Sequence, residues 1–232
     1  MAGLHPRTGR SRRPLVYQGV ALACGKRHED EAEAQGYVAV AGVDEVGRGA
    51  LCGPVLAAAV MLGRGFDTGG LDDSKRLTPR QRQRLAERVR SAARAWAVGR
   101  AEVEEVDRHN ILRATQLAMR RAVAGLSPAP DLLLVDALVV PGLELPQRAI
   151  VKGDAVSVSI AAASIVAKVA RDALMLELDV RFPGYGLARN KGYASSDHRE
   201  ALRRLGPSAI HRRSFHVADV AQPWLFEPGP AH

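Results

Sequence analysis

Short apolar runs and longer stretches of helical periodicity alternate along this chain. The runs 38–43 and 55–62 lie close together, and Gly53 and Gly63 bound the second, so they predict two paired strands. Because the second run is rich in alanine, a helix is the alternative there. The polar and apolar alternation over 95–103 predicts a third strand.

Two more strands and several helices complete the pattern. Consecutive aliphatic residues over 132–135 predict a buried parallel strand that ends at Asp136, and 148–152 predicts another short strand. The predicted helices are 78–93 with Thr78 as N-cap, a helix capped by Asp107 and stopped at Gly125, 157–180 and 196–205. This order of elements predicts an α/β fold.

The ends of the chain differ from the part between them. Residues 1–36 lack sustained periodicity and run from a basic cluster to an acidic patch, which predicts a disordered N-terminal extension. Residues 218–232 are rich in proline and glycine and predict a C-terminal tail. We therefore expect one catalytic domain over 37–217.

Several classes of protein are disfavoured by composition. No run approaches the roughly 18 to 20 apolar residues of a membrane span, and no signal core follows the basic start, so we expect a cytoplasmic protein without membrane contact. Cys24 and Cys52 are the two cysteines, which makes a disulfide framework or a cysteine metal site improbable. His198 and His211 lack metal-ligand spacing, and we expect surface or capping roles for them.

The formal net charge is +8, from 33 lysines and arginines against 25 aspartates and glutamates. A cationic surface gains affinity for nucleic acid by releasing condensed counterions. An arginine-rich solvated surface would give the same excess, so the charge alone does not decide between the two explanations.

Four acidic residues stand at the ends of predicted strands or in the turns after them: Asp44, Glu45, Asp136 and Asp154. Mg²⁺ takes oxygen ligands of this kind, with one or two carboxylates per ion. Two ions roughly 4 Å apart can activate a water and stabilise a leaving oxygen in phosphoryl transfer. For any single acid a cap or turn is the commoner role, but the adjacent pair after an apolar strand favours a metal-dependent phosphohydrolase of undefined substrate.

A series of short motifs follows in fixed order along about 38–215, most of the chain. They are Val43-Asp44-Glu45-Val46-Gly47-Arg48-Gly49, Gly53-Pro54-Val55, Ala57-Ala58-Ala59-Val60, Asp73-Ser74-Lys75, Lys152-Gly153-Asp154, the run Ile160 to Val169 with Arg171-Asp172, Asn190-Lys191-Gly192-Tyr193 and His211-Arg212-Arg213-Ser214-Phe215. In residues and order this series closely resembles the bacterial ribonuclease HII family.

The resemblance implies a ribonuclease H-like fold, in which helices flank a mixed five-stranded sheet and the C-terminal part is helical. It implies an endonuclease for RNA/DNA hybrids and ribonucleotide-containing duplex DNA. Cutting 5′ of a ribonucleotide leaves 3′-hydroxyl and 5′-phosphate ends. It also implies Mn²⁺ or Mg²⁺, two ions with substrate bound, held by the four carboxylates named above. A monomer is expected.

The resemblance also assigns residues to the substrate. Gly47, Arg48, Gly49 and Tyr193 together correspond to the residues that recognise the ribose 2′-hydroxyl at an RNA-to-DNA junction. This fits elementary chemistry, since glycine lets a backbone approach a sugar closely and the 2′-hydroxyl distinguishes RNA from DNA. Lys75 and Arg48 are expected to contact phosphates.

The chain departs from the family pattern at three positions. Proline and alanine usually stand where this chain has Ala50 and Cys52, and glycine often follows the third acid, where this chain has Ala137. The first two changes are small and should adjust the turn without removing ligands. Ala137 should affect the local backbone geometry more than the activity.

Some alternatives stay open at this point. Asp172 is a rival for the fourth carboxylate, but an ion pair with Lys168 four residues earlier on a helix is the simpler explanation. For Arg213, a contact to phosphate and a solvated surface position both stay open. The related type III enzyme would need a larger N-terminal domain, and a non-catalytic hybrid-binding protein on the same scaffold is the alternative from another class.

Overall fold

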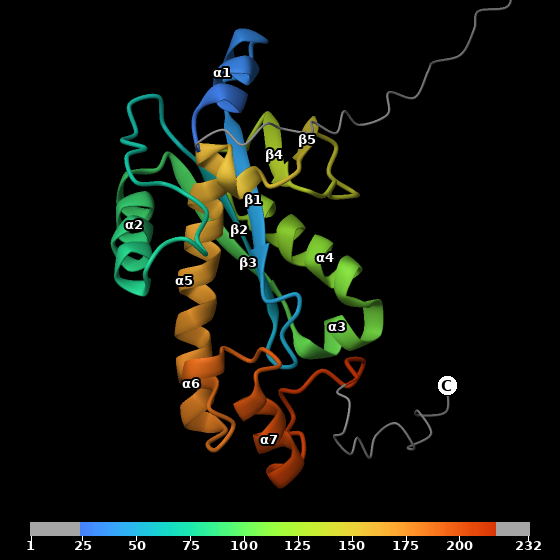
Figure 1. Cartoon of the computed structure of the whole chain (residues 1–232). Coiled ribbons are helices and arrows are strands. Elements are labelled where there is room, and N and C mark those ends of the chain that lie inside the picture. Colours follow the sequence, from blue (N-terminus) through green and yellow to red (C-terminus); the bar gives the residue numbers. More distant parts are fainter. Residues whose placement is uncertain (1–23, 217–232) are drawn as a thin grey trace, which may run out of the picture.

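The computed structural model describes residues 24–216, which form one mixed five-stranded sheet in the order β3-β2-β1-β4-β5 (Figure 1). Antiparallel pairs join β1 to β2 and β2 to β3, while β4 lies parallel to β1 and β5 parallel to β4. The predicted mixed sheet is confirmed. Its strands are β1 (Val40–Val46), β2 (Val55–Met61), β3 (Ala95–Ala101), β4 (Leu132–Asp136) and β5 (Gln147–Ile150).

Helices cover both faces of this sheet. Figure 1 shows α5 (Val158–Arg181) and α2 (Pro79–Ala92) on one side, and α4 (Ile111–Ala124) with α3 (Val103–His109) on the other. Every residue of β2 is therefore buried, with Ala57 and Ala59 in the cluster that includes α4 and Ala58 in the cluster that includes α5. Burial on both faces explains why this strand lacks the polar alternation of a half-exposed one.

The C-terminal part is helical, as predicted. Helices α6 (Leu187–Asn190) and α7 (Ser196–Leu205) gather at the far end of α5 (Figure 1). Their apolar residues form a separate core with the turn between β1 and β2, through contacts that include Cys52, Met175 and Leu202. This small core fixes the C-terminal helices beside the turn that follows β1.

Cap residues show where the helix predictions succeeded and failed. Thr78 forms the predicted N-cap of α2, in a capping box with Gln81. The predicted cap at Asp107 is wrong, because Asp107 lies inside α3, and Asn110 caps α4 with its side chain. Asp107 instead accepts hydrogen bonds from the backbone N–H groups of Arg213 and Ser214.

Part of the predicted N-terminal extension is ordered. Helix α1 covers Arg27–Ala34, so the prediction of disorder is wrong there. Glu29 of α1 accepts hydrogen bonds from the Ser157 hydroxyl at 2.6 Å and the Ser159 N–H at 3.0 Å, which joins α1 to the first turn of α5. The remaining predicted extension over 1–23 and the predicted tail over 218–232 lie outside the described residues. Within the described part, none of the helices combines the length and apolar character needed to cross a bilayer.

Candidate active site

Strands β1 and β4 bring three of the four predicted carboxylates together. The register pairs Val43 with Val135 in parallel strands, so the next residues, Asp44 and Asp136, stand at neighbouring positions on the same edge of the sheet. Asp44 and Glu45 were expected after the first strand, but β1 continues through them to Val46. The strand backbone, not a turn, therefore fixes these two acids.

The fourth carboxylate comes from the short 3₁₀ helix Gly153–Ala155 that follows β5. The Gly153 N–H donates to Asp136 Oδ1 at 2.7 Å, which ties this turn to the end of β4. Asp154 is buried, and its Oδ2 accepts a hydrogen bond from Lys75 Nζ at 3.1 Å. The structure thus brings Asp154 and Lys75 to the same site as the β1 and β4 acids.

A pocket of about 240 Å³ opens at this edge of the sheet. Its walls come from β1, the loop after β1, the segment before α2, the end of β4, the middle of α5 and the segment before α7. The residues that line it are Asp44, Glu45, Val46, Gly47, Arg48, Gly49, Ser74, Lys75, Asp136, Ser164, Lys168 and Tyr193. Of the nine predicted site residues, Asp154 alone is missing from this lining, and it joins the pocket through Lys75.

Burial and crowding disturb the titration of these acids. Burial raises the pKa of Asp44 well above its usual range, and the charges of Glu45 and Asp136 raise it further. Burial also raises the pKa of Asp136 to about 6, although the hydrogen bond from the Gly153 N–H acts in the opposite direction and lowers it. Burial lowers the pKa of Lys75, but the hydrogen bond to Asp154 and the negative charges of Asp154, Asp73 and Asp44 together outweigh burial, so the pKa is raised. The protein alone therefore does not neutralise the cluster fully.

The donor set fits hard divalent cations. Glu45 lines the pocket, and its Oε2 atom is buried without a hydrogen-bond partner among the described residues, so this oxygen lacks compensation. Asp44, Glu45 and Asp136 line one pocket, and Asp154 is joined to it through Lys75, so the site offers several carboxylate oxygens on neighbouring elements. Mg²⁺ or Mn²⁺ with one or two carboxylates each, and water or phosphate oxygens besides, suits this arrangement.

The loop after β1 has a backbone that requires glycine. Gly47 has a φ of +91°, and a Cβ there would lie 2.5 Å from Nε of the buried Arg171. Arg48 pairs with Glu45 at 3.1 Å and keeps 42% of its side chain exposed. Gly47 thus allows the positive φ that this loop adopts, and Arg48 lines the pocket with its charge partly exposed.

Two buried arginines hold this loop, and sequence reasoning missed both of them. Arg212 donates to the carbonyls of Gly47, Arg48 and Gly53 at 2.8 to 3.0 Å. Arg171 donates to the carbonyls of the chain between β1 and β2 and of Lys191. Arginines are usually solvated, so only their place in the motifs could have signalled this role.

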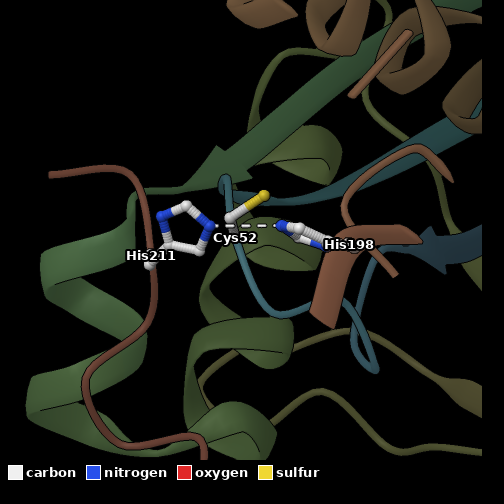
Figure 2. A group of neighbouring side chains, drawn as sticks. All are labelled: Cys52, His198 and His211. Carbon is white, nitrogen blue, oxygen red and sulfur yellow. Dashed lines mark hydrogen bonds between the residues drawn. The ribbon is translucent and has the colours of Figure 1, made fainter. Parts of the chain in front are cut away.

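Other predictions for single residues have mixed outcomes. The ion pair of Asp172 with Lys168 is confirmed at 2.5 Å. The surface or capping roles expected for His198 and His211 are wrong, because both rings are buried and their Nε2 atoms lie 3.2 Å apart. With the sulfur of Cys52 they form a compact group of three donor atoms (Figure 2).

Comparison with known proteins gives matches along most of the chain. The family model described as Ribonuclease HII matches residues 41–218. The ribonuclease HII of Myxococcus xanthus is 58% identical over 190 residues, which are 82% of this chain and 65% of that protein. The ribonuclease HII of Moorella thermoacetica is 54% identical over 187 residues, which are 81% of this chain and 91% of that protein.

Solved structures of ribonucleases H2 and HII superpose on this chain. The ribonuclease H2 of Pyrococcus horikoshii superposes with a TM-score of 0.65 at 28% identity, covering 77% of this chain and 94% of that one. The ribonuclease HII of Archaeoglobus fulgidus, solved in complex with PCNA, superposes with a TM-score of 0.67 at 26% identity, covering 79% and 98%.

The mixed sheet and these neighbours define a ribonuclease H-like fold, and they place the chain in the ribonuclease H class of hydrolases. Within that class, the chain belongs to the ribonuclease HII family.

Proposed function

We propose that the protein hydrolyses the RNA strand of RNA/DNA hybrids and incises duplex DNA on the 5′ side of single embedded ribonucleotides. The products carry 3′-hydroxyl and 5′-phosphate ends, and the reaction would serve removal of ribonucleotides from the genome. The observation that carries this proposal is one pocket that joins Asp44, Glu45 and Asp136 to the Gly47-Arg48-Gly49 loop and Tyr193.

In this proposal the four carboxylates hold the metal. Asp44, Glu45, Asp136 and Asp154 offer oxygen donors, and Glu45 Oε2 is available without breaking a hydrogen bond in the described structure. Two divalent ions, Mn²⁺ or Mg²⁺, would supply the charge that activates a water for in-line attack and stabilises the leaving 3′-oxygen. The hydrogen bond from the Gly153 N–H to Oδ1 restrains Asp136, which lines the pocket.

The remaining residues orient the substrate. Gly47, Arg48 and Gly49 line one wall of the pocket, and Tyr193, 38% exposed, lines it as well. We assign this loop and Tyr193 to recognition of the ribose 2′-hydroxyl, the group that distinguishes RNA from DNA. Lys75 keeps 79% of its side chain exposed while its ammonium reaches Asp154, which suits a contact to a phosphate beside the metals.

The test is cleavage of a labelled DNA duplex that contains one ribonucleotide, in Mg²⁺ and in Mn²⁺, with wild type and Asp136→Asn side by side. An all-DNA duplex of the same sequence is the control substrate. We expect wild type to cut 5′ of the ribonucleotide, and Asp136→Asn to lose at least two orders of magnitude in rate, because metal-organised charge dominates such reactions.

A different result would support the non-catalytic alternative. If wild type binds the duplex but does not cut it in either metal, the protein is a hybrid-binding protein on a nuclease scaffold. Binding that survives replacement of all four acids by Asn or Gln would point the same way, since a binding protein needs no cluster of mutually repelling carboxylates.

A further inference from the structure

Next to the backbone carbonyl of Tyr193 lies a buried pair of histidines that the proposed reaction does not use. His198 comes from α7 and His211 from the segment after it, and both are nearly inaccessible to solvent. Figure 2 shows a nitrogen of each ring pointing at the other, with Cys52 beside them. The two Nε2 atoms lie 3.2 Å apart, at hydrogen-bond distance.

The neighbours of this pair fix where its protons are. The Ser208 backbone N–H donates to His211 Nδ1 at 3.0 Å, and because a backbone N–H only donates, that nitrogen carries no proton. The Ser208 hydroxyl also lies 3.0 Å from Nδ1 and donates to it in this tautomer. Neutral His211 therefore carries its proton on Nε2 and donates to His198 Nε2. His198 then carries its proton on Nδ1, which donates to the Tyr193 carbonyl at 3.0 Å.

These bonds form a directed chain from Ser208 through both imidazoles to the backbone of Tyr193. Each ring nitrogen has a partner, as buried polar atoms require. Burial lowers the pKa of both rings, that of His211 to about 4, so both stay neutral near pH 7. We call this chain the histidine relay.

A transition metal on Cys52, His198 and His211 is the alternative use of the same atoms. Two imidazole nitrogens on one zinc ion would lie roughly 3.3 Å apart, close to the distance seen. Such an ion would force the His211 proton onto Nδ1, against the Ser208 N–H. Burial also raises the pKa of the Cys52 thiol to about 11, which opposes the thiolate a metal needs. The hydrogen bonds therefore favour the relay.

The relay ends at a segment that is fixed from several sides. The Tyr193 carbonyl also accepts from the Ser195 N–H at 2.8 Å, and the Leu51 N–H donates to the Gly192 carbonyl at 2.8 Å. Gly192 has a φ of +81°, and a Cβ there would lie 2.9 Å from the Cys52 sulfur. The backbone of Tyr193 is thus held rigidly while its ring stays exposed at the pocket.

We propose that His198 and His211 are positioning residues that fix Tyr193 for recognition of the ribonucleotide sugar. This inference rests on the proposed function, because it gives Tyr193 the 2′-hydroxyl side of the substrate. The relay acts through the tyrosine backbone alone, so neither histidine needs to touch substrate. A displaced ring would weaken sugar recognition without removing any metal ligand.

Two substitutions at one position separate the ends of the relay. In His198→Asn the amide replaces Nδ1 and can still donate to the Tyr193 carbonyl. In His198→Gln it replaces Nε2 and can meet His211 but not Tyr193. We expect His198→Gln to lower kcat/KM for the single-ribonucleotide duplex on the order of tenfold, the scale of one lost hydrogen bond. His198→Asn should lose less than about threefold.

A double-mutant cycle tests whether the effect passes through Tyr193. In a Tyr193→Ala background, His198→Gln should have almost no further effect on kcat/KM, because there is no ring left to place. Additive losses would overturn the proposal, and so would equal losses in the Asn and Gln variants. Thermal unfolding of each variant identifies a general loss of folding.

A measurement on the unmodified protein keeps the inference testable if a variant fails to fold. The ¹⁵N shifts of the imidazoles at neutral pH should show one buried histidine protonated on Nδ1, His198, and one on Nε2, His211. Reversed tautomers would overturn the relay whatever the kinetics. Absence of cleavage by wild type would instead refute the proposed function, and the inference about sugar recognition would fall with it.

Discussion

Ala137 occupies a backbone conformation that an L-residue adopts at a cost. It follows Asp136 directly, has a φ of +52° and donates its N–H to the Ile150 carbonyl at 3.0 Å. The left-handed region costs an L-residue about 1 to 2 kcal/mol, and glycine removes this cost. The greater freedom of glycine in the unfolded chain offsets about 0.4 to 1 kcal/mol of that gain. We expect Ala137→Gly to raise the free energy of unfolding by about 0.5 to 1 kcal/mol.

Ala124→Gly is the matched control for this substitution. Ala124 is also exposed, but it belongs to α4 and has helical backbone angles, so glycine there should destabilise by about 0.5 to 1 kcal/mol. Urea unfolding of the three proteins gives the comparison. Equal destabilisation in both variants would show that Ala137 is not strained.

Asp136 is destabilising when it is ionised and no metal is present. Its pKa is about 6 instead of 3.8, which corresponds to about 3 kcal/mol, reduced to about 1 to 2 kcal/mol because the group is partly exposed to solvent. Since the folded state binds this proton more tightly, the contribution is favourable at low pH and is lost as the pH rises through 6. Asp136→Asn should therefore stabilise the metal-free protein by about 1 to 2 kcal/mol at pH 7.

Urea unfolding in EDTA at pH 7 and pH 4 checks this expectation. The difference between Asp136→Asn and wild type should nearly vanish at pH 4, where the folded wild type carries the proton already. Mn²⁺ should stabilise wild type more than the variant, because binding to the folded state alone adds stability. A variant that is less stable than wild type at pH 7 in EDTA would refute the assignment of repulsion to Asp136.

At the scale of elements, the apolar pattern alone identified the strands that build the site. The aliphatic run before Asp136 predicted β4 and the placement of that acid at its end, and the structure confirms both. Helix α1 was missed, because its stability comes from the contact of Glu29 with α5 and not from an apolar stripe. Asp107 was mistaken for a cap because a short extra helix precedes Asn110, and polarity alone does not distinguish two such neighbours.

The loop after β1 shows which part of the site the sequence could not predict. Its carboxylates and glycines stand together in one motif, but the side chains that hold it come from distant segments. Arg212 lies more than 150 residues after Gly53, and its 1% exposure is a property of the fold. Arginine and histidine are commonly on the surface, so composition favours the wrong assignment for them.

Arg212→Lys tests the hold on this loop. Lysine keeps the charge but has no planar fork, so it loses most of the bonds to the carbonyls of Gly47, Arg48 and Gly53. We expect a loss of about 2 to 4 kcal/mol in the free energy of unfolding, since buried acceptors are left unsatisfied. Arg203→Lys on the exposed side of α7 should change it by less than about 0.5 kcal/mol. If the two variants lose the same free energy of unfolding, the hydrogen bonds of Arg212 do not stabilise the loop.

At the scale of the whole molecule, the C-terminal helices are attached to the sheet through buried polar groups as well as an apolar core. Arg171, Arg212 and the histidine relay lie between α5, α7 and the turn after β1. Burial lowers the pKa of Arg212 to about 10, with the charge of Arg171 adding to this. Another positive charge in this region would therefore be unfavourable. Lowering the pH would place such a charge on the ring of His211.

The pH dependence of stability measures this effect. The pKa of His211 is about 4 in the folded protein against 6.5 ordinarily, because of burial and the neighbouring His198, and Arg171 and Arg212 are the other cations of this buried region. The unfolded chain thus binds the proton more tightly between pH 6.5 and 4, and stability must fall as the pH is lowered through that range. The full loss is about 3 kcal/mol.

His211→Gln supplies the comparison, because glutamine can still donate to His198 but does not titrate. Asp44 and Asp136 have raised pKa values, so their protonation makes folding more favourable as the pH falls. Protonation of His211 has the opposite effect, so the free energy of unfolding of wild type alone does not separate the two contributions. Both proteins share those acids, and the difference between their urea unfolding curves at pH 7, 5.5 and 4.5 isolates the histidine. Wild type should lose stability relative to the variant as the pH falls. If the difference stays constant, His211 is protonated as easily in the folded protein as in the unfolded chain, and the buried neutral relay is incorrect.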